Sequence, residues 1–294
     1  MAIGVYDSGF GGLTVLRQLC ASLPERDFVY LGDSGRAPYG GRDSHTLLDF
    51  AEQCVERLFE EGCLLVVVAC NTISCVALRH LQHRYAGPRS PRRVLGVTIP
   101  AVEAAVAASA GHIGVLGTQR TVASGTFVEE IRKLGPHRVT QRAAPLLAAL
   151  VEEGWEATDI ARQAVARYLE GLEDVDTLVL GCTHYPLLLP VFEAATRARV
   201  LDPAPFVAER LRGWLARHGE FDAVGSGPGS KEEAAPAART GSLKVLCSGD
   251  PDVFVRHGRR FFGAGLPRPG HVAEDGGRLR HRESVSVLVG QVVR

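Results

Sequence analysis

The chain has 294 residues, of which 46% are hydrophobic and 22% are charged, and its formal net charge is zero. This composition is ordinary for a soluble globular protein, and the length suits two domains of common size. A neutral chain lacks the excess positive charge that attracts nucleic acid or an anionic membrane surface, so we predict neither as a partner.

The N-terminus and the cysteines indicate the cellular compartment. The first residues lack the basic segment and long apolar core of a signal peptide, and no apolar run reaches the roughly 18 residues of a membrane span. The 7 cysteines are an odd number at irregular spacing, and no two form a C-x-x-C pair, so we expect neither a zinc site nor a redox dithiol. Free thiols are typical of a reducing cytosol. We therefore expect a cytoplasmic protein without a bound metal.

Short apolar runs alternate with amphipathic segments along most of the chain, which predicts parallel sheets and an α/β fold. A glycine-rich loop, 8–12, follows the first expected strand. The expected strands are 2–6, 28–31, 64–68, 94–97, 113–116, 177–180, 200–201, 243–247 and 285–289. The expected helices are 13–23, 44–61, 72–85, 101–110, 121–134, 156–172, 187–196, 204–217 and 251–262. Residues 222–241, rich in Gly, Ser, Pro and Ala, interrupt the pattern and predict a flexible surface insertion.

Two cysteines follow all-apolar runs typical of parallel strands that are covered on both faces. Cys70 lies in Val66-Val67-Val68-Ala69-Cys70-Asn71-Thr72, and Cys182 lies in Leu178-Val179-Leu180-Gly181-Cys182-Thr183-His184-Tyr185-Pro186. Catalytic residues in such sheets gather at the carboxyl ends of strands. The repeated pattern predicts two related α/β units that face each other across a cleft. Two thiols there suit a reaction with acid/base groups on both sides of one atom, such as inversion of a stereocentre.

Polar side chains beside the two thiols could complete such a site. Asp7 ends the first strand and could serve Cys70, while His184 could hold a proton near neutral pH. The loop after Asp7 fits neither the dinucleotide-binding nor the Walker A pattern, and with Ser8 it could bring backbone amides to an anion. Asp33 could be an acid/base helper. Short side chains that could bind carboxylates are Asn71, Thr72, Thr118, Thr121 and Thr183.

Each of these residues also has a plainer interpretation. Asp7 and Asp33 could cap turns, His184 could be a buried hydrogen-bonding group, and the threonines could cap helices. A thiol hydrolase with one Cys–His pair is the other chemistry to consider, although it would leave the second cysteine motif without a role.

Taken together, the motifs resemble those of the glutamate racemases, within the cofactor-independent aspartate/glutamate racemase family. His184 is typical of the glutamate members, since aspartate racemases usually carry glutamate at that place. The run Ala143-Ala144-Pro145 departs from many relatives, which have a cysteine before the proline, and we expect no loss of activity from it. The resemblance covers nearly the whole chain apart from 222–241. Its segments are 7–13, 32–40, 69–72, 151–154, 181–186 and 248–251.

The resemblance implies a two-base racemisation of glutamate that needs no pyridoxal phosphate, other cofactor or metal. Cys70 would remove the α-proton of D-glutamate and Cys182 would protonate the opposite face, with the roles exchanged in reverse. Asp7 would assist Cys70, and His184 would assist Cys182. Further helpers would be Asp33, Glu152, Thr118 and Thr121. Ser8, Tyr39 and Gly40 would hold the side-chain carboxylate, and Asn71, Thr72 and Thr183 the α-carboxylate.

The fold that the resemblance implies is two similar α/β domains, with mainly parallel sheets flanked by helices and the active site in the interdomain cleft. On this basis we place the first domain at 1–97 plus 208–294 and the second at 98–207. The resemblance also implies a homodimer that supplies D-glutamate for peptidoglycan. The alternatives are a racemase for aspartate or another amino acid, an isomerase or decarboxylase of the same superfamily, and a binding protein on the same fold. The paired thiols favour a racemase.

Overall fold

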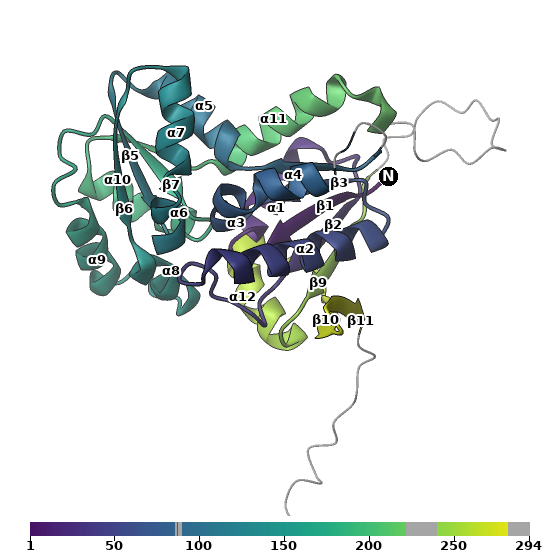
Figure 1. Cartoon of the computed structure of the whole chain (residues 1–294). Coiled ribbons are helices and arrows are strands. Elements are labelled where there is room, and N and C mark those ends of the chain that lie inside the picture. Colours follow the sequence, from purple (N-terminus) through teal and green to yellow (C-terminus); the bar gives the residue numbers. More distant parts are fainter. Residues whose placement is uncertain (86, 88–89, 222–239, 282–294) are drawn as a thin grey trace, which may run out of the picture.

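The computed structural model describes residues 1–85, 87, 90–221 and 240–281, and within them the strands form two sheets (Figure 1). The larger sheet has the order β11-β10-β9-β2-β1-β3-β4, and the smaller has the order β6-β5-β7-β8. Neighbouring strands pair in parallel except in the hairpin β10–β11. The α/β fold with mainly parallel sheets is therefore confirmed.

The larger sheet lies between two layers of helices. Its strands are β1 (Ile3–Asp7), β2 (Phe28–Gly32), β3 (Leu65–Val68), β4 (Arg93–Gly96), β9 (Leu243–Cys247), β10 (Gly270–Asp275) and β11 (Arg278–His281). One face packs against α1 (Leu13–Ser22), α11 (Ala204–Ala216) and α12 (Pro251–Phe262). The other packs against α2 (Ser44–Glu60), α3 (Asn71–Val76) and α4 (Leu78–Tyr85).

The smaller sheet is covered in the same way. Its strands are β5 (His112–Gly117), β6 (Arg138–Ala143), β7 (Thr177–Gly181) and β8 (Arg199–Leu201). Helices α5 (Thr98–Ala108) and α7 (Thr126–Leu134) pack on one face. The other face packs against α8 (Pro145–Glu152), α9 (Asp159–Leu169) and α10 (Leu189–Ala195). The remaining short elements are α6 (Gln119–Ala123), η1 (Tyr185–Leu188) and η2 (Gly219–Phe221).

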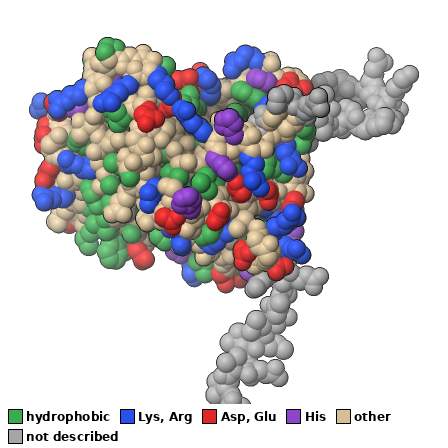
Figure 2. Space-filling model, viewed as in Figure 1, with side chains coloured by type: hydrophobic (Ala, Val, Ile, Leu, Met, Phe, Trp, Pro, Cys, Tyr) green, Lys and Arg blue, Asp and Glu red, His purple; other side chains and the backbone are tan. Residues whose placement is uncertain are grey.

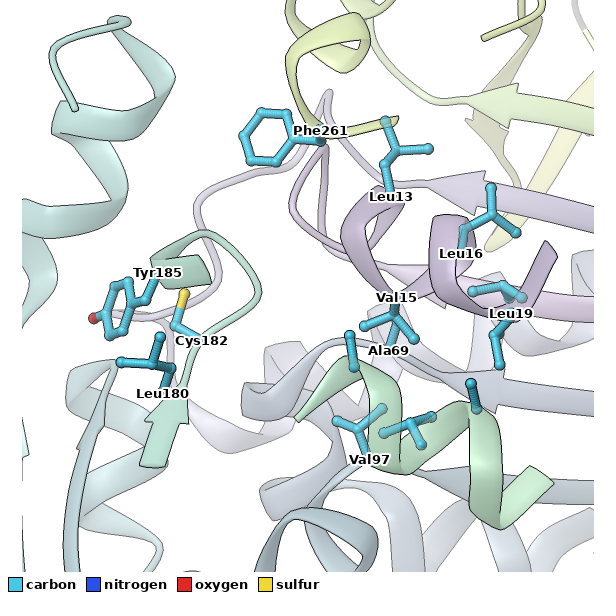
Figure 3. Close-up of a cluster of buried hydrophobic side chains, with 14 of the residues drawn as sticks. Leu13, Val15, Leu16, Leu19, Ala69, Val97, Leu180, Cys182, Tyr185 and Phe261 are labelled. Atoms are coloured by element: carbon cyan, nitrogen blue, oxygen red, sulfur yellow. The ribbon is translucent and has the colours of Figure 1, made fainter. Parts of the chain in front are cut away.

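Side chains of the central strands alternate between the two helix layers, as the pleat of a strand requires. Ile3 and Val5 of β1 join the cluster of α1 and α11, whereas Tyr6 joins the cluster of α2 and α4. The first of these clusters continues into the smaller sheet, and Figure 3 shows both Leu16 of α1 and Leu180 of β7 among its members. This continuous core fixes the position of one sheet relative to the other.

The structure corrects several predicted elements. The single helix expected at 121–134 is two helices, because Gly125 between them has a left-handed φ of 69°. The helix expected at 72–85 divides at Ala77 into α3 and α4, and that at 187–196 begins as the 3-10 helix η1. Strand β6, helix α8 and the hairpin β10–β11 were not expected. The predicted strand 285–289, and residues 222–239 of the expected insertion, lie outside the described residues.

The surface agrees with the balanced charge of the chain. On the face drawn in Figure 2, basic and acidic side chains are interspersed and not gathered by sign. Within the described residues, no helix is long and apolar enough to cross a membrane.

Candidate active site

The carboxyl ends of strands from both sheets meet at one cavity of about 330 Å³. Residues that follow β1, β3, β5 and β7 all contribute to its lining, as expected for sheets of parallel strands. Most of the predicted site residues line it: Ser8, Tyr39, Gly40, Cys70, Asn71, Thr72, Thr118, Glu152, Cys182, Thr183 and His184. Asp7, Asp33 and Thr121 do not appear in the lining.

Cys70 lies immediately before α3, on the side of the larger sheet. The thiol is almost fully buried and its Sγ donates to Ser8 Oγ at 3.6 Å. Burial, together with the nearby carboxylate of Asp7, raises the pKa of the Cys70 thiol to about 12. In the resting protein Cys70 therefore holds its proton.

Asp7 lies behind Cys70 and is completely buried. Its Oδ2 accepts the backbone N–H of Gly9 at 2.9 Å, and among the described residues its Oδ1 has no partner at hydrogen-bond geometry. Burial raises the pKa of Asp7, while the charge of His184 and the nearby amides of Gly12 and Gly9 oppose that rise. The buried Asp7 carboxyl therefore binds a proton more tightly than an exposed aspartate does, and it lies next to the Cys70 thiol.

A chain of three side chains lies on the side of the smaller sheet. Cys182 Sγ is 3.8 Å from His184 Nδ1, and His184 Nε2 is 2.9 Å from Glu152 Oε1. Burial opposes a charge on His184, but its contacts with Cys182 and Glu152 raise its pKa to about 10. Burial likewise opposes the charge of Glu152, but the hydrogen bond from His184 lowers its pKa. His184 is therefore a cation at neutral pH, and its Nδ1 lies beside the Cys182 sulfur.

Threonine hydroxyls join the two sides of the cavity. Thr72 Oγ1 lies 2.9 Å from Thr118 Oγ1, which is also 3.0 Å from Thr121 Oγ1. Thr118 caps α6, as its plainer interpretation predicts, and also lines the cavity. Asn71 is buried, and its Oδ1 has no partner in the described part of the chain. An unpaired buried amide oxygen at a cavity wall is available to a ligand.

Tyr39 and Asp33 belong to a buried network behind the cavity wall. The Tyr39 hydroxyl donates to the Asp33 carboxylate and accepts from the Tyr6 hydroxyl at 3.1 Å. The same carboxylate accepts from Arg36 Nε at 2.7 Å and from the Ser248 hydroxyl. Because the Tyr39 hydroxyl is already engaged, Tyr39 can offer the cavity only its ring and backbone. The contacts of Asp33 hold the loop that carries Tyr39 in place.

Replacing Asp33 with alanine is expected to lower the free energy of unfolding by about 3 kcal/mol, because the partly buried Arg36 loses its carboxylate partner. Urea unfolding followed by circular dichroism measures this change. Asp49→Ala, at an acidic position of α2, is the matched control, and a loss no larger than that of the control would contradict the structural role.

Several lining residues were not predicted. Pro145, Ala148 and Ala149 come from α8, and Gln119 comes from the start of α6. Small apolar side chains carry no chemical signature, so only the position of α8 reveals them. The segment 151–154, which carries part of the family resemblance, did point to this region. The sequence pattern did not predict the helix α8 that leads into it. Among the described residues, no three His, Cys, Asp or Glu side chains are grouped so as to hold a metal ion.

Comparison with known proteins agrees with this geometry. The family model described as Asp/Glu/Hydantoin racemase matches residues 15–211. The glutamate racemase of Geobacter metallireducens is 38% identical over 271 residues, which cover 90% of this chain and 94% of that protein.

Solved structures show the same fold. A glutamate racemase from Francisella tularensis in complex with D-glutamate has a TM-score of 0.81 at 26% identity, and the match covers 92% of this chain and 97% of that one. A glutamate racemase from Thermus thermophilus in complex with beta-chloro-D-alanine has a TM-score of 0.78 at 34% identity, with 92% and 96% covered. The chain therefore belongs to the Asp/Glu/hydantoin racemase family and is an amino-acid racemase.

Proposed function

We propose that the protein interconverts L- and D-glutamate by moving protons between the substrate Cα and two cysteines, without a cofactor. The observation that carries this proposal is that Cys70 and Cys182, supplied by different sheets, line the same cavity. The names of the similar proteins support glutamate as the substrate.

The protonated Cys70 suits the reaction of L-glutamate, in which it acts as the acid. Cys182, whose Sγ lies beside His184, takes the α-proton as the base, and Cys70 gives its proton to the opposite face of the carbanion-like centre. The reaction of D-glutamate starts from the opposite protonation, with Cys70 as the base and Cys182 as the acid. Asp7 assists the proton transfer at Cys70, and His184 assists the proton transfer at Cys182. The preorganised polar groups of the cavity stabilise the negative charge that develops at Cα.

The cavity wall offers groups for both ends of the substrate. We assign Ser8, Gly40 and the backbone of Tyr39 to the side-chain carboxylate. Asn71, Thr72 and Thr183 are assigned to the α-carboxylate. The free Oδ1 of Asn71 is also suited to the ammonium group of an amino acid, because that oxygen can only accept a hydrogen bond.

We place the first domain at 1–97 plus 208–294 and the second at 98–207. The sheet composition supports this division, since β1–β4 and β9–β11 form one sheet and β5–β8 form the other. A homodimer, a cytoplasmic location and a supply of D-glutamate to peptidoglycan stay predictions.

Incubation of the pure protein with L-glutamate in D₂O, with no added cofactor, is expected to cause loss of optical rotation and uptake of deuterium at Cα. L-Aspartate in parallel is expected to stay unchanged. Racemisation of aspartate instead would favour the alternative substrate. No change in either amino acid would contradict the proposed function and direct attention to other substrates of the superfamily or to a binding role.

The turnover number for L-glutamate is expected to fall as the pH rises through about 10. His184 is cationic below this pKa and neutral above it, so at high pH the site loses a positive charge that stabilises the developing carbanion. The rate at saturating L-glutamate, measured from pH 7 to 11, tests this. In His184→Asn the same alkaline decline should be absent, and its persistence there would assign the decline to another group.

A further inference from the structure

We propose that Arg260 is a positioning residue for the Cys182 side of the reaction, because it holds the end of α8 so that Glu152 stays against His184. The inference rests on the proposed function, since it concerns the same acid/base groups. Arg260 lies on α12, which packs on the larger sheet, whereas Glu152 and His184 belong to the part of the chain around the smaller sheet.

Arg260 contacts both the last residue of α8 and the segment that follows this helix. Its Nη1 donates to the backbone carbonyl of Glu152 at 3.1 Å, and its Nη2 lies 2.6 and 2.5 Å from the two carboxylate oxygens of Glu156. The side chains of Arg260 and Glu156 are 29% and 27% exposed, so water screens the pair only in part. The guanidinium thereby satisfies a carbonyl that the end of a helix leaves unpaired.

The turn between Glu152 and Glu156 lies beside this guanidinium. Gly154 has a left-handed φ of 82°, and a Cβ placed on it would lie 3.6 Å from the Arg260 Cζ and Nη1 atoms. This is an ordinary van der Waals distance, so the glycine is required by its left-handed φ and not by crowding against the guanidinium. Arg260 contacts the chain on both sides of this glycine, through the backbone carbonyl of Glu152 and the side-chain carboxylate of Glu156.

Glu152 needs such support because its own side chain is 41% exposed. An exposed ion pair gains little free energy, since water screens it and both side chains lose rotamer freedom. The 2.9 Å contact from Glu152 Oε1 to His184 Nε2 thus depends on where the backbone of α8 ends. That backbone position is what the bond from Arg260 fixes.

The next residue of α12 contacts His184, the middle member of the same chain of groups. The Phe261 ring meets the His184 imidazole edge to face, with centroids 5.3 Å apart and an interplanar angle of 81°. Figure 3 shows this ring extending from its helix toward the part of the structure that carries Cys182 and Tyr185. Adjacent residues of α12 therefore orient the imidazole and the carboxylate that binds it.

The charged and titratable groups around His184 come from several elements. Cys182 and Glu152 contact it directly, the Asp7 carboxyl interacts with its charge, and His257 of α12 interacts electrostatically with Glu152. Of these, the Glu152 contact is the one that Arg260 controls. If Glu152 moves away, the imidazole loses a partner of its cationic form, so its affinity for a proton falls.

The experiment compares Arg260→Gln and Arg260→Lys with the wild type. Arg260→Gln is expected to lower kcat for L-glutamate about 10-fold with a much smaller change in KM, because proton transfer depends steeply on geometry. The alkaline limb of kcat should move to lower pH by about one unit. Arg260→Lys keeps the charge and a donor, and is expected to recover part of both effects. Arg210→Gln is the matched control, since Arg210 contacts both carboxylate oxygens of Glu103 and does not line the cavity.

A second readout needs no turnover. The pKa of the His184 imidazole is measured by NMR titration in wild type and Arg260→Gln, with the signal assigned by its loss in His184→Asn. A lower imidazole pKa in Arg260→Gln supports the proposal, and an unchanged pKa overturns it, as do an unchanged kcat and alkaline limb. If the wild type racemised neither amino acid, the proposed function would fail while the titration still decided the role of Arg260.

Discussion

Cys182→Ser and Cys70→Ser are each expected to lower the rate of glutamate racemisation by about 10³-fold or more. A serine hydroxyl is a far weaker acid than a thiol, so at neutral pH it neither carries the negative charge of a base nor gives up a proton readily. Because L- and D-glutamate have equal free energies, kcat/KM must be the same in both directions. The loss must therefore appear whichever enantiomer is supplied.

Exchange of the substrate α-proton with D₂O distinguishes Cys182→Ser from Cys70→Ser. Cys182→Ser retains Cys70 and is expected to exchange the α-proton of D-glutamate with D₂O without inverting it. Cys70→Ser is expected to do so with L-glutamate only. Cys75→Ser, which changes a cysteine within α3 whose Sγ lies 3.6 Å from Thr98 Oγ1, should keep near wild-type racemisation. Substantial two-way racemisation by either active-site variant would rule out the two-base assignment.

The chemistry of the site could be predicted from the sequence because it resides in short segments that follow strands. Cys70 and Cys182 come directly after buried apolar strands, and parallel strands bring their carboxyl ends to one edge. The strand assignments therefore predict that the two thiols lie near polar side chains. The two-sheet organisation followed from the same repeated pattern.

The parts that could not be predicted depend on contacts between distant segments. Strand β6 is half exposed at the edge of its sheet and has a polar sequence, so it lacks the apolar run that identified β3 and β7. Helix α8 is almost uniformly apolar, and periodicity does not distinguish such a segment from other buried structure. The engagement of the Tyr39 hydroxyl by Asp33 is likewise invisible in the sequence, although the two residues are only six apart.

Glycine at position 11 shows how closely the two cysteine-bearing sides approach each other. Gly11 lies in the loop between β1 and α1, and a Cβ placed on it would lie 2.2 Å from Thr183 Oγ1 and 2.6 Å from His184 Nδ1. Neither distance is compatible with van der Waals contact. The Thr14 hydroxyl lies between the same two segments, 2.9 Å from the Gly11 carbonyl and 3.3 Å from the Thr183 carbonyl, so its one proton is shared between these acceptors.

Gly11→Ala is therefore expected to lower kcat about 100-fold, because a displacement of about 1 Å at catalytic groups has an effect of that size. The added methyl must push Thr183 and His184 away, which separates Cys182 from its partner and widens the distance that the proton must cross. Gly9→Ala is the graded comparison, since its added methyl would meet only the Ala37 Cβ, at 3.9 Å. Steady-state kinetics with both enantiomers measures the two variants, and thermal unfolding confirms that each is folded. An equal and small loss in both would mean that the loop moves freely against the second cysteine motif, and the tight apposition would then not be a requirement of catalysis.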